Sequence, residues 1–416
     1  MKKILQAAGL ASVSAAILST PTLAEGAGKW YTLTAGIHGF YDDNIYTAPK
    51  GSGRKFASPG VDVTPGIQLT FPMEQTKVSL GYNYGMKWYS DRDPNGAHNR
   101  DIDQSHNFNA DLSHVFSPRY KVSVYERFII AQEPDQLIGS GGIQTLGRAE
   151  GNNVRNHAGL DFEAQLTHLW STGLSYQNNY YDYADTSYAT PLNRMEHVPG
   201  IRFNYQFTPT TVLGFGYNYE IRDYRPFALV NRDMQSHRVY GSVDHSFTGT
   251  IQASLRGGVE VSNWDAPGVK GETSPYADAS LTWTYNPGSF LQGGIHHGRE
   301  ATDAYLGTAV DIIDSEATSF YVALSHAITP RLNGSLSARY QFGDLKYNGS
   351  ANSISTDKYL LLGAVISYKF TQYLSADMAY YYDDARSSGG QYIPAFNGHG
   401  RDFERNRVYF GVRLTY

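Results

Sequence analysis

Residues 77–88 read Lys-Val-Ser-Leu-Gly-Tyr-Asn-Tyr-Gly-Met-Lys-Trp, and this stretch decides the fold class. Every second position, from Val78 to Trp88, is apolar or aromatic, while the positions between them carry Lys, Ser, Gly and Asn. A period of two places the apolar side chains on one face of a β-strand and the polar ones on the other. The stretch is also long enough to cross a bilayer as a tilted strand, which takes about 9–11 residues.

The same alternation recurs along the chain between short turn signals such as Phe116-Ser117-Pro118 and Phe207-Thr208-Pro209. The signals return roughly every 40 residues, and a strand period inside each repeat excludes a helical repeat. We expect about 18 strands: 31–41, 61–71, 78–88, 106–116, 120–130, 158–168, 172–182, 199–207, 213–221, 239–247, 251–261, 275–285, 291–297, 320–328, 332–342, 360–370, 374–382 and 407–416.

The connections alternate in length, which indicates how the strands are arranged. Short turns alternate with long segments that are rich in Gly, Asp, Asn, Ser and Pro, such as 132–156 and 384–405. Short periplasmic turns and long extracellular loops are typical of a transmembrane antiparallel β-barrel, an all-β fold. A soluble barrel would point the apolar face inward, but about 18 strands enclose too wide a lumen for side chains to fill. The apolar face must then contact lipid.

The first segment predicts export from the cytoplasm. Lys2 and Lys3 precede a mostly small and apolar stretch, and Thr22-Leu23-Ala24 fits a cleavage site, so residues 1–24 read as a signal peptide. Residues 25–416 would then form a single barrel in the outer membrane of a Gram-negative-type bacterium. The expected partners are outer-membrane lipid, lipopolysaccharide and the barrel assembly machinery. The formal net charge of −5 argues against nucleic acid as a partner.

The chain offers little that would hold a cofactor or a metal ion. It has no cysteine, which excludes disulfides, thiolate metal sites and covalent haem attachment. His114, His168, His245 and His326 each precede a turn, but they come from different hairpins and should form a ring at the inner membrane boundary. No nucleophile with an activating partner is recognisable in the sequence. We therefore expect no enzyme activity, no cofactor and no metal site.

The inward positions carry charges of both signs, and two interpretations of them stay open. They line either a channel with a mild preference for anions or acidic glycans, or a wall of mutually paired charges. Tyrosines at inward positions, such as Tyr125 and Tyr240, either stack on sugars or pack against the wall. The lumen-lining candidates are Lys77, Lys87, Lys121, Arg127, Arg202, Arg222, Arg238, Arg256, Arg339, Lys369, Arg407, Arg413, Asp111, Asp161, Glu163, Glu220, Asp244, Glu260, Asp278 and Asp377.

The last strand carries a second recognisable pattern. Its alternating residues Val408, Phe410, Val412, Leu414 and Tyr416 end at the final position of the chain. The pattern resembles the terminal-strand signal that the assembly machinery of outer-membrane proteins reads, although that signal usually ends in Phe.

One hexapeptide connects the chain to a known family. Tyr41, Asp42, Asp43, Asn44, Ile45 and Tyr46 follow the first strand and resemble the signature of the Putative beta-barrel porin 2 family. The strand plan over residues 30–416 is similar to that family as well. The resemblance implies an outer-membrane barrel that often supports export of a surface polysaccharide, with polysaccharide export components as partners. We expect Asp42, Asp43 and Asn44 to shape the first loop through Asx-type hydrogen bonds.

The sequence leaves three candidate functions. The leading expectation, taken from the family resemblance, is a channel with a hydrophilic lumen that supports polysaccharide export and is partly obstructed by loops 132–156 and 384–405. The alternatives are a diffusion porin for small hydrophilic solutes and a non-conducting barrel that anchors partners.

Overall fold

The computed structural model describes residues 29–53, 55–92, 101–132, 137–138, 143–145, 152–184, 193–225, 231–302, 312–347, 356–388 and 402–416. The expected signal peptide, residues 1–24, lies outside these ranges, as does much of the two loops expected to obstruct the lumen. Within the described ranges, no helix is long and apolar enough to cross a membrane.

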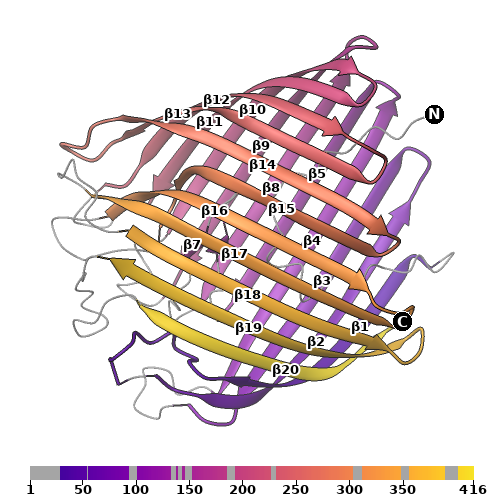
Figure 1. Ribbon diagram of the computed structural model, residues 1–416, viewed down its shortest axis with the longest axis vertical. Coiled ribbons are helices and arrows are strands. Elements are labelled where there is room, and N and C mark those ends of the chain that lie inside the picture. The colour runs from indigo at the N-terminus through magenta and orange to yellow at the C-terminus, as the bar shows by residue number, and fades with distance from the viewer. Residues whose placement is uncertain are drawn as a thin grey trace.

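Eighteen strands form one closed antiparallel sheet, with the strands tilted across the cylinder (Figure 1). Neighbours along the chain pair with each other, β5 pairs with β8, and β1 closes the cylinder by pairing with β20. Closure leaves no open sheet edge, which lipid requires. The strands of the wall are β1 (Tyr31–Asp42), β2 (Ser58–Pro72), β3 (Thr76–Tyr89), β4 (Ile102–Ser117), β5 (Tyr120–Ala131), β8 (Asn153–Gln165), β9 (Trp170–Tyr183), β10 (Arg194–Thr208), β11 (Thr211–Tyr224), β12 (Met234–Ser246), β13 (Ile251–Trp264), β14 (Glu272–Asn286), β15 (Ser289–Glu300), β16 (Ile312–Ala327), β17 (Leu332–Tyr347), β18 (Thr356–Lys369), β19 (Leu374–Ser388) and β20 (Phe403–Thr415).

The predicted fold class and strand number are confirmed, but the strands extend further than the sequence indicated. At the loop end, β8 begins at Asn153 instead of 158, and β10 begins at Arg194 instead of 199. These extensions carry polar residues on both faces, so the alternation that identifies a strand fades while backbone pairing continues. Two short strands, β6 (Leu137–Ile138) and β7 (Ile143–Thr145), pair with each other in loop 132–156 and were not expected.

Side-chain exposure shows which way the alternation faces. On β3, Leu80 and Trp88 are 42% and 40% exposed, whereas Tyr89 on the opposite face is 1% exposed. On β20, Phe410 is 65% exposed and Tyr409 only 6%. All five residues of the expected assembly signal share the exposed face, and Tyr416 pairs its backbone with Leu33 of β1. The apolar set therefore faces outward along the whole wall, as the Val78–Trp88 stretch predicts.

The seam between β1 and β20 is held by the hexapeptide that follows β1. Arg405 on β20 shares its single Nε–H between the two oxygens of the Asp42 carboxylate, at 3.0 and 3.1 Å, and donates a further hydrogen bond from Nη2 at 2.5 Å. The Asn44 amide N–H donates to Asp42 Oδ1 at 3.0 Å, which is the expected Asx-type bond. Asn44 also uses its side chain to bind the Ala48 N–H at 2.8 Å and the Glu404 carbonyl at 3.0 Å. The hexapeptide thus ties the first loop to the closing strand.

Asp43 makes a second connection across the same seam. Its carboxylate accepts hydrogen bonds from the Asn406 backbone and from Lys55, at 2.7 and 2.9 Å. Burial works against the charge, but these hydrogen bonds hold the pKa of Asp43 below its usual value. The carboxylate therefore stays ionised and keeps the loop on the wall.

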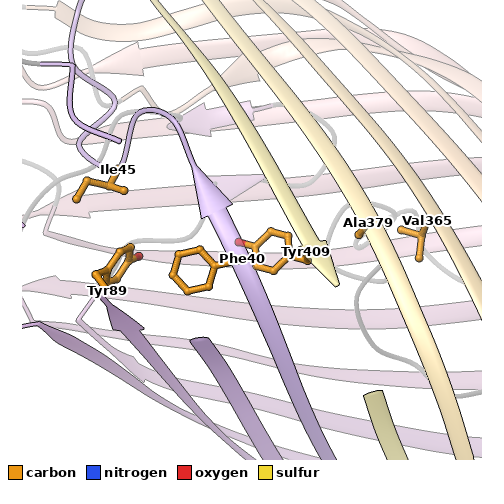
Figure 2. Packing of buried hydrophobic residues seen from close by; sticks show 6 residues of the cluster. All are labelled: Phe40, Ile45, Tyr89, Val365, Ala379 and Tyr409. Atoms are coloured by element: carbon orange, nitrogen blue, oxygen red, sulfur yellow. The ribbon is translucent and has the colours of Figure 1, made fainter. Parts of the chain in front are cut away.

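Apolar residues of the same loop pack inside the barrel mouth. Ile45 is fully buried and lies over Phe40 and Tyr89, with Tyr409 on the far side of Phe40 (Figure 2). The Phe40 ring lies 5.2 Å from the Tyr89 ring and 5.7 Å from the Tyr409 ring. This cluster is a small core on the inner face, formed where the first loop folds back.

Inward aromatic rings lie over glycines of the neighbouring strands. A Cβ atom at Gly159 would come within 2.3 Å of the Tyr125 ring, and one at Gly216 within 2.3 Å of the Tyr240 ring. Each tyrosine is the direct cross-strand partner of its glycine. Because glycine leaves room for the ring to lie flat, these rings cover the wall instead of projecting across the lumen.

We predict that the seam depends on its buried ion pair more than on its exposed one. Asp42→Asn removes a carboxylate that is 2% exposed and breaks its ion pair with Arg405, and breaking a buried pair costs about 3–5 kcal/mol. Lys50→Gln breaks the exposed pair between Lys50 and Glu404, which is worth about 0–1 kcal/mol. Urea unfolding of both variants in lipid vesicles measures the difference. Equal losses would contradict the assigned role of Asp42.

We also predict that Gly216→Ala lowers stability by about 1–3 kcal/mol, because the added methyl group displaces the Tyr240 ring. Gly257→Ala is the matched control, since a Cβ at Gly257 meets no atom within 4 Å. The unfolding midpoint in urea should fall for the first variant and hold or rise for the second. A Gly216→Ala protein as stable as the parent would show that the ring does not rest on the glycine.

Candidate functional site: the inner wall

The inner wall is the face opposite the exposed apolar side chains. The pairing register places every lumen-lining candidate on this face. For example, Arg238 is the direct cross-strand partner of Glu260, and Asp278 is that of Arg256. The wall therefore brings the candidates together in rows that run from strand to strand.

Ion pairs connect many of these candidates. Arg127 lies 2.7 Å from Asp111, and Arg202 lies 2.7 Å from Glu163. Further pairs join Arg238 to Glu260 at 2.9 Å, Arg407 to Asp383 at 2.7 Å and Arg413 to Asp377 at 3.6 Å. Of the two interpretations left open by the sequence, this geometry favours a wall whose charges neutralise each other.

A continuous network runs across the loop ends of β10 and β11. Glu196 lies between two arginines, at 2.7 Å from Arg194 Nε and 3.7 Å from Arg222 Nε. Arg222 in turn donates from Nη2 to Glu220 at 2.6 Å. Arg194 and Glu196 were missed from the sequence because the strand was expected to begin after them. Continuing the alternation backward from Gly200 through the inward positions 198, 196 and 194 would have found both.

The interior is more tightly packed toward the loop ends than toward the turns. Arg194, Arg222 and Glu260 are 4%, 3% and 0% exposed, although they lie on the inner face. Near the turns, Lys77 and Gln252 are exposed on the same face. A solute entering from the turn end therefore meets accessible polar side chains first and the closely packed network last.

Further acidic side chains that the sequence analysis missed change the charge balance of the wall. They include Asp62, Asp103, Glu196, Glu300, Asp357 and Asp383, whereas the missed bases Arg155, Arg194 and Arg405 are fewer. Counted with the candidates, the two signs are close to balance. The excess of basic residues that suggested an anion preference is thus largely cancelled.

One row on the inner wall has the residue types of a catalytic triad. Asp278, His296 and Ser319 are direct cross-strand partners on β14, β15 and β16. His296 Nδ1 lies 3.3 Å from Asp278 Oδ2, but its Nε2 lies 3.4 Å from Glu300. Ser319 is fully buried and accepts a hydrogen bond from Arg339 at 3.5 Å. The base therefore does not contact the serine, and the row lacks the geometry of an activated nucleophile.

Two histidines near the turns, His114 and His245, contact neighbouring threonine and phenylalanine side chains of the barrel wall. His114 Nδ1 lies 2.7 Å from Thr76 Oγ1, and its ring packs edge-on against Phe116 at 4.4 Å. His245 repeats both contacts with Thr211 and Phe247. Among the described residues, no three metal-ligating side chains cluster together. The ring of histidines thus has the contacts of a membrane-boundary girdle.

Comparison with solved structures finds other outer-membrane proteins at low identity. OccAB4 of Acinetobacter baumannii is 11% identical, with a TM-score of 0.46, and covers 93% of this chain and 99% of its own. The outer membrane protein OpdK from Pseudomonas aeruginosa gives the same values. The FrpB iron transporter from Neisseria meningitidis is 10% identical at a TM-score of 0.46, covering 94% of this chain and 81% of its own. No curated protein matches the chain in sequence.

Solved structures at this low identity do not assign the chain to a family, but a family model does. The model described as Putative beta-barrel porin 2 matches residues 33–416, from β1 to the last residue. The match agrees with the closed 18-stranded wall, the lipid-facing apolar set and the polar inner face. The protein is an outer-membrane β-barrel of the porin type, and the chain belongs to the Putative beta-barrel porin 2 family.

Proposed function

We propose that the protein is a passive diffusion channel for small hydrophilic solutes. The observation that carries this proposal is the closed wall, whose inward face carries polar and charged side chains on every strand beside a small apolar cluster at the loop end. The accessible side chains near the turns, such as Lys77 and Gln252, support a wide periplasmic entrance. The buried network that includes Arg194 and Glu196 supports a narrower passage toward the loops.

The proposed channel discriminates weakly between anions and cations. Most charges on the wall are paired, and a paired charge presents little net field to a passing ion. Arg256 is an inward base that makes no ion pair among the described residues, and it would attract anions locally. We therefore expect low selectivity overall, with Arg256 as a point of anion attraction.

Support of polysaccharide export is the second candidate function. It derives from the family resemblance, and one feature of the wall favours it. The half-buried rings of Tyr125 and Tyr240 lie on the inner face and rest on glycines of the neighbouring strands. Flat aromatic surfaces of this kind are suited to stacking on sugar rings. A third possibility, an anchoring barrel without a pore, predicts no conductance at all.

We predict that the purified protein conducts ions in planar bilayers with a reversal potential close to zero in a salt gradient. A protein that inserts but stays electrically silent would contradict a channel and favour an anchoring barrel. Swelling of proteoliposomes in sugars of increasing size separates the other two functions. A sharp cut-off at small sugars supports diffusion, whereas passage of a long glycan supports export.

We predict that replacing Arg256, Arg339 and Arg413 together with Gln shifts the reversal potential toward cation selectivity. The variant removes three inward positive charges from β13, β17 and β20. The matched control replaces Arg202 and Glu163 together with Gln, which removes an ion pair of no net charge. The control should keep the parent's reversal potential. No shift in the triple variant would show that these side chains do not face the permeation path.

A further inference from the structure

One carboxylate faces lipid in the middle of the wall. Glu126 lies on the outward face of β5, on the same side as Val124 and Ile130, which are both 39% exposed. Its direct cross-strand partners are Ala110 on β4 and Ala158 on β8. Other outward charges of the described strands lie at strand ends, so Glu126 is alone among them in its position. A charged residue placed within the membrane band is costly and usually has a function.

A second polar side chain without a partner lies beside it. Asn156 is also on the outward face, two residues from Ala158 along β8. Its Oδ1 is enclosed and accepts no hydrogen bond. Among the described residues, the structure gives neither the Glu126 carboxylate nor the Asn156 amide a hydrogen bond or an ion pair. Lipid chains offer no donor or acceptor, so both groups remain unsatisfied in a single barrel facing lipid.

The polar groups continue as a strip across the neighbouring strands. Ala158 is the partner of Asn178 on β9, which is the partner of His197 on β10. The Asn178 side-chain nitrogen donates to the Glu196 carbonyl and lies 3.2 Å from His197 Nδ1. The outward face from β5 to β10 therefore carries carboxylate, amide and imidazole groups. The polar strip is defined here as Glu126, Asn156, Asn178 and His197.

We propose that the polar strip is the contact surface for a second copy of this chain, in a two-fold dimer within the membrane. A two-fold interface brings the same patch of both copies together, so the patch must complement itself. The polar strip complements itself because it holds a hydrogen-bond acceptor, the Glu126 carboxylate, beside a donor, the Asn156 side-chain amide. Around the axis, Glu126 of each copy accepts a hydrogen bond from Asn156 of the other.

The small residues beside the carboxylate make this approach possible. Ala110 and Ala158 flank Glu126 on both sides, so the backbones of two barrels can come close without larger side chains intervening. Lipid headgroups are a poorer partner, because exposed apolar residues lie both below and above Glu126 on its own strand. The second copy gives the Glu126 carboxylate a donor and the Asn156 side-chain N–H an acceptor, and it excludes lipid from both.

Cysteine cross-linking in intact outer membranes tests the proposal, since the chain has no cysteine of its own. Ala158→Cys places a thiol in the strip, and Ala364→Cys is the matched control on the outward face of β18, far around the barrel. We expect a short bifunctional reagent to double the mass of the Ala158→Cys protein and to leave Ala364→Cys monomeric. Equal cross-linking of both variants, or of neither, would overturn the dimer. A product with an unrelated protein at Ala158→Cys would overturn the second copy as the occupant.

A second variant tests the role of the polar groups themselves. Glu126→Leu with Asn156→Leu replaces both groups with side chains that suit lipid, so the barrel should stay folded and keep its heat-modifiable migration on gels. The native mass in mild detergent should fall from dimer to monomer. A folded variant that stays dimeric, or a parent protein that is monomeric under the same conditions, would refute the proposed interface. Bilayer conductance of the folded monomer keeps this result separate from the channel function.

Discussion

The structure depends on one constraint, that every strand of a lipid-exposed sheet must pair on both sides. Lipid offers no hydrogen bonds to a free edge, so the sheet has to close on itself. The β1–β20 ladder performs this closure, and the Asp42–Arg405 ion pair holds it at the loop end. The two faces of the closed sheet then meet different surroundings, which is why side chains alternate along every strand. The exposed apolar residues of the last strand, the rings near the turns and the polar inner face all follow from this arrangement.

The inner wall manages its charges by pairing them. A barrel of this width needs polar residues on its inner face, but isolated charges would repel one another and bind ions tightly. Pairs such as Arg202 with Glu163 and Arg238 with Glu260 keep the inner face nearly neutral. Pairing also joins adjacent strands through their side chains, in addition to the backbone ladder. A wall of this kind suits a passage that lets many small solutes through and retains few of them.

The barrel wall also explains why the chain is rich in tyrosine and glycine. The chain holds 33 Tyr and 42 Gly, and these two residue types meet across strands. Tyr125 over Gly159 and Tyr240 over Gly216 show how a large inward ring can cover the wall without crossing the lumen. Tyrosines on the outer face serve a different purpose, as at Tyr176, whose hydroxyl lies 2.7 Å from His197 Nδ1. Tyrosine is therefore suited to both faces, because its ring packs against glycine on the inner face and its hydroxyl finds a hydrogen-bond partner on the outer face.

The sequence by itself determined the number of strands in the barrel wall and the face that each residue of the predicted strands occupies. A period of two is a local property, so it can be read from any stretch such as Val78–Trp88 without knowledge of the partner strands. It also placed the Asx turn of Asp42 and Asn44, because that hydrogen bond spans two residues. The tertiary structure decided which charges pair, how near the wall is to neutrality and where the packed network lies. Those features depend on the register between strands and on the strand extensions beyond the lipid layer, where the alternation no longer marks the strand.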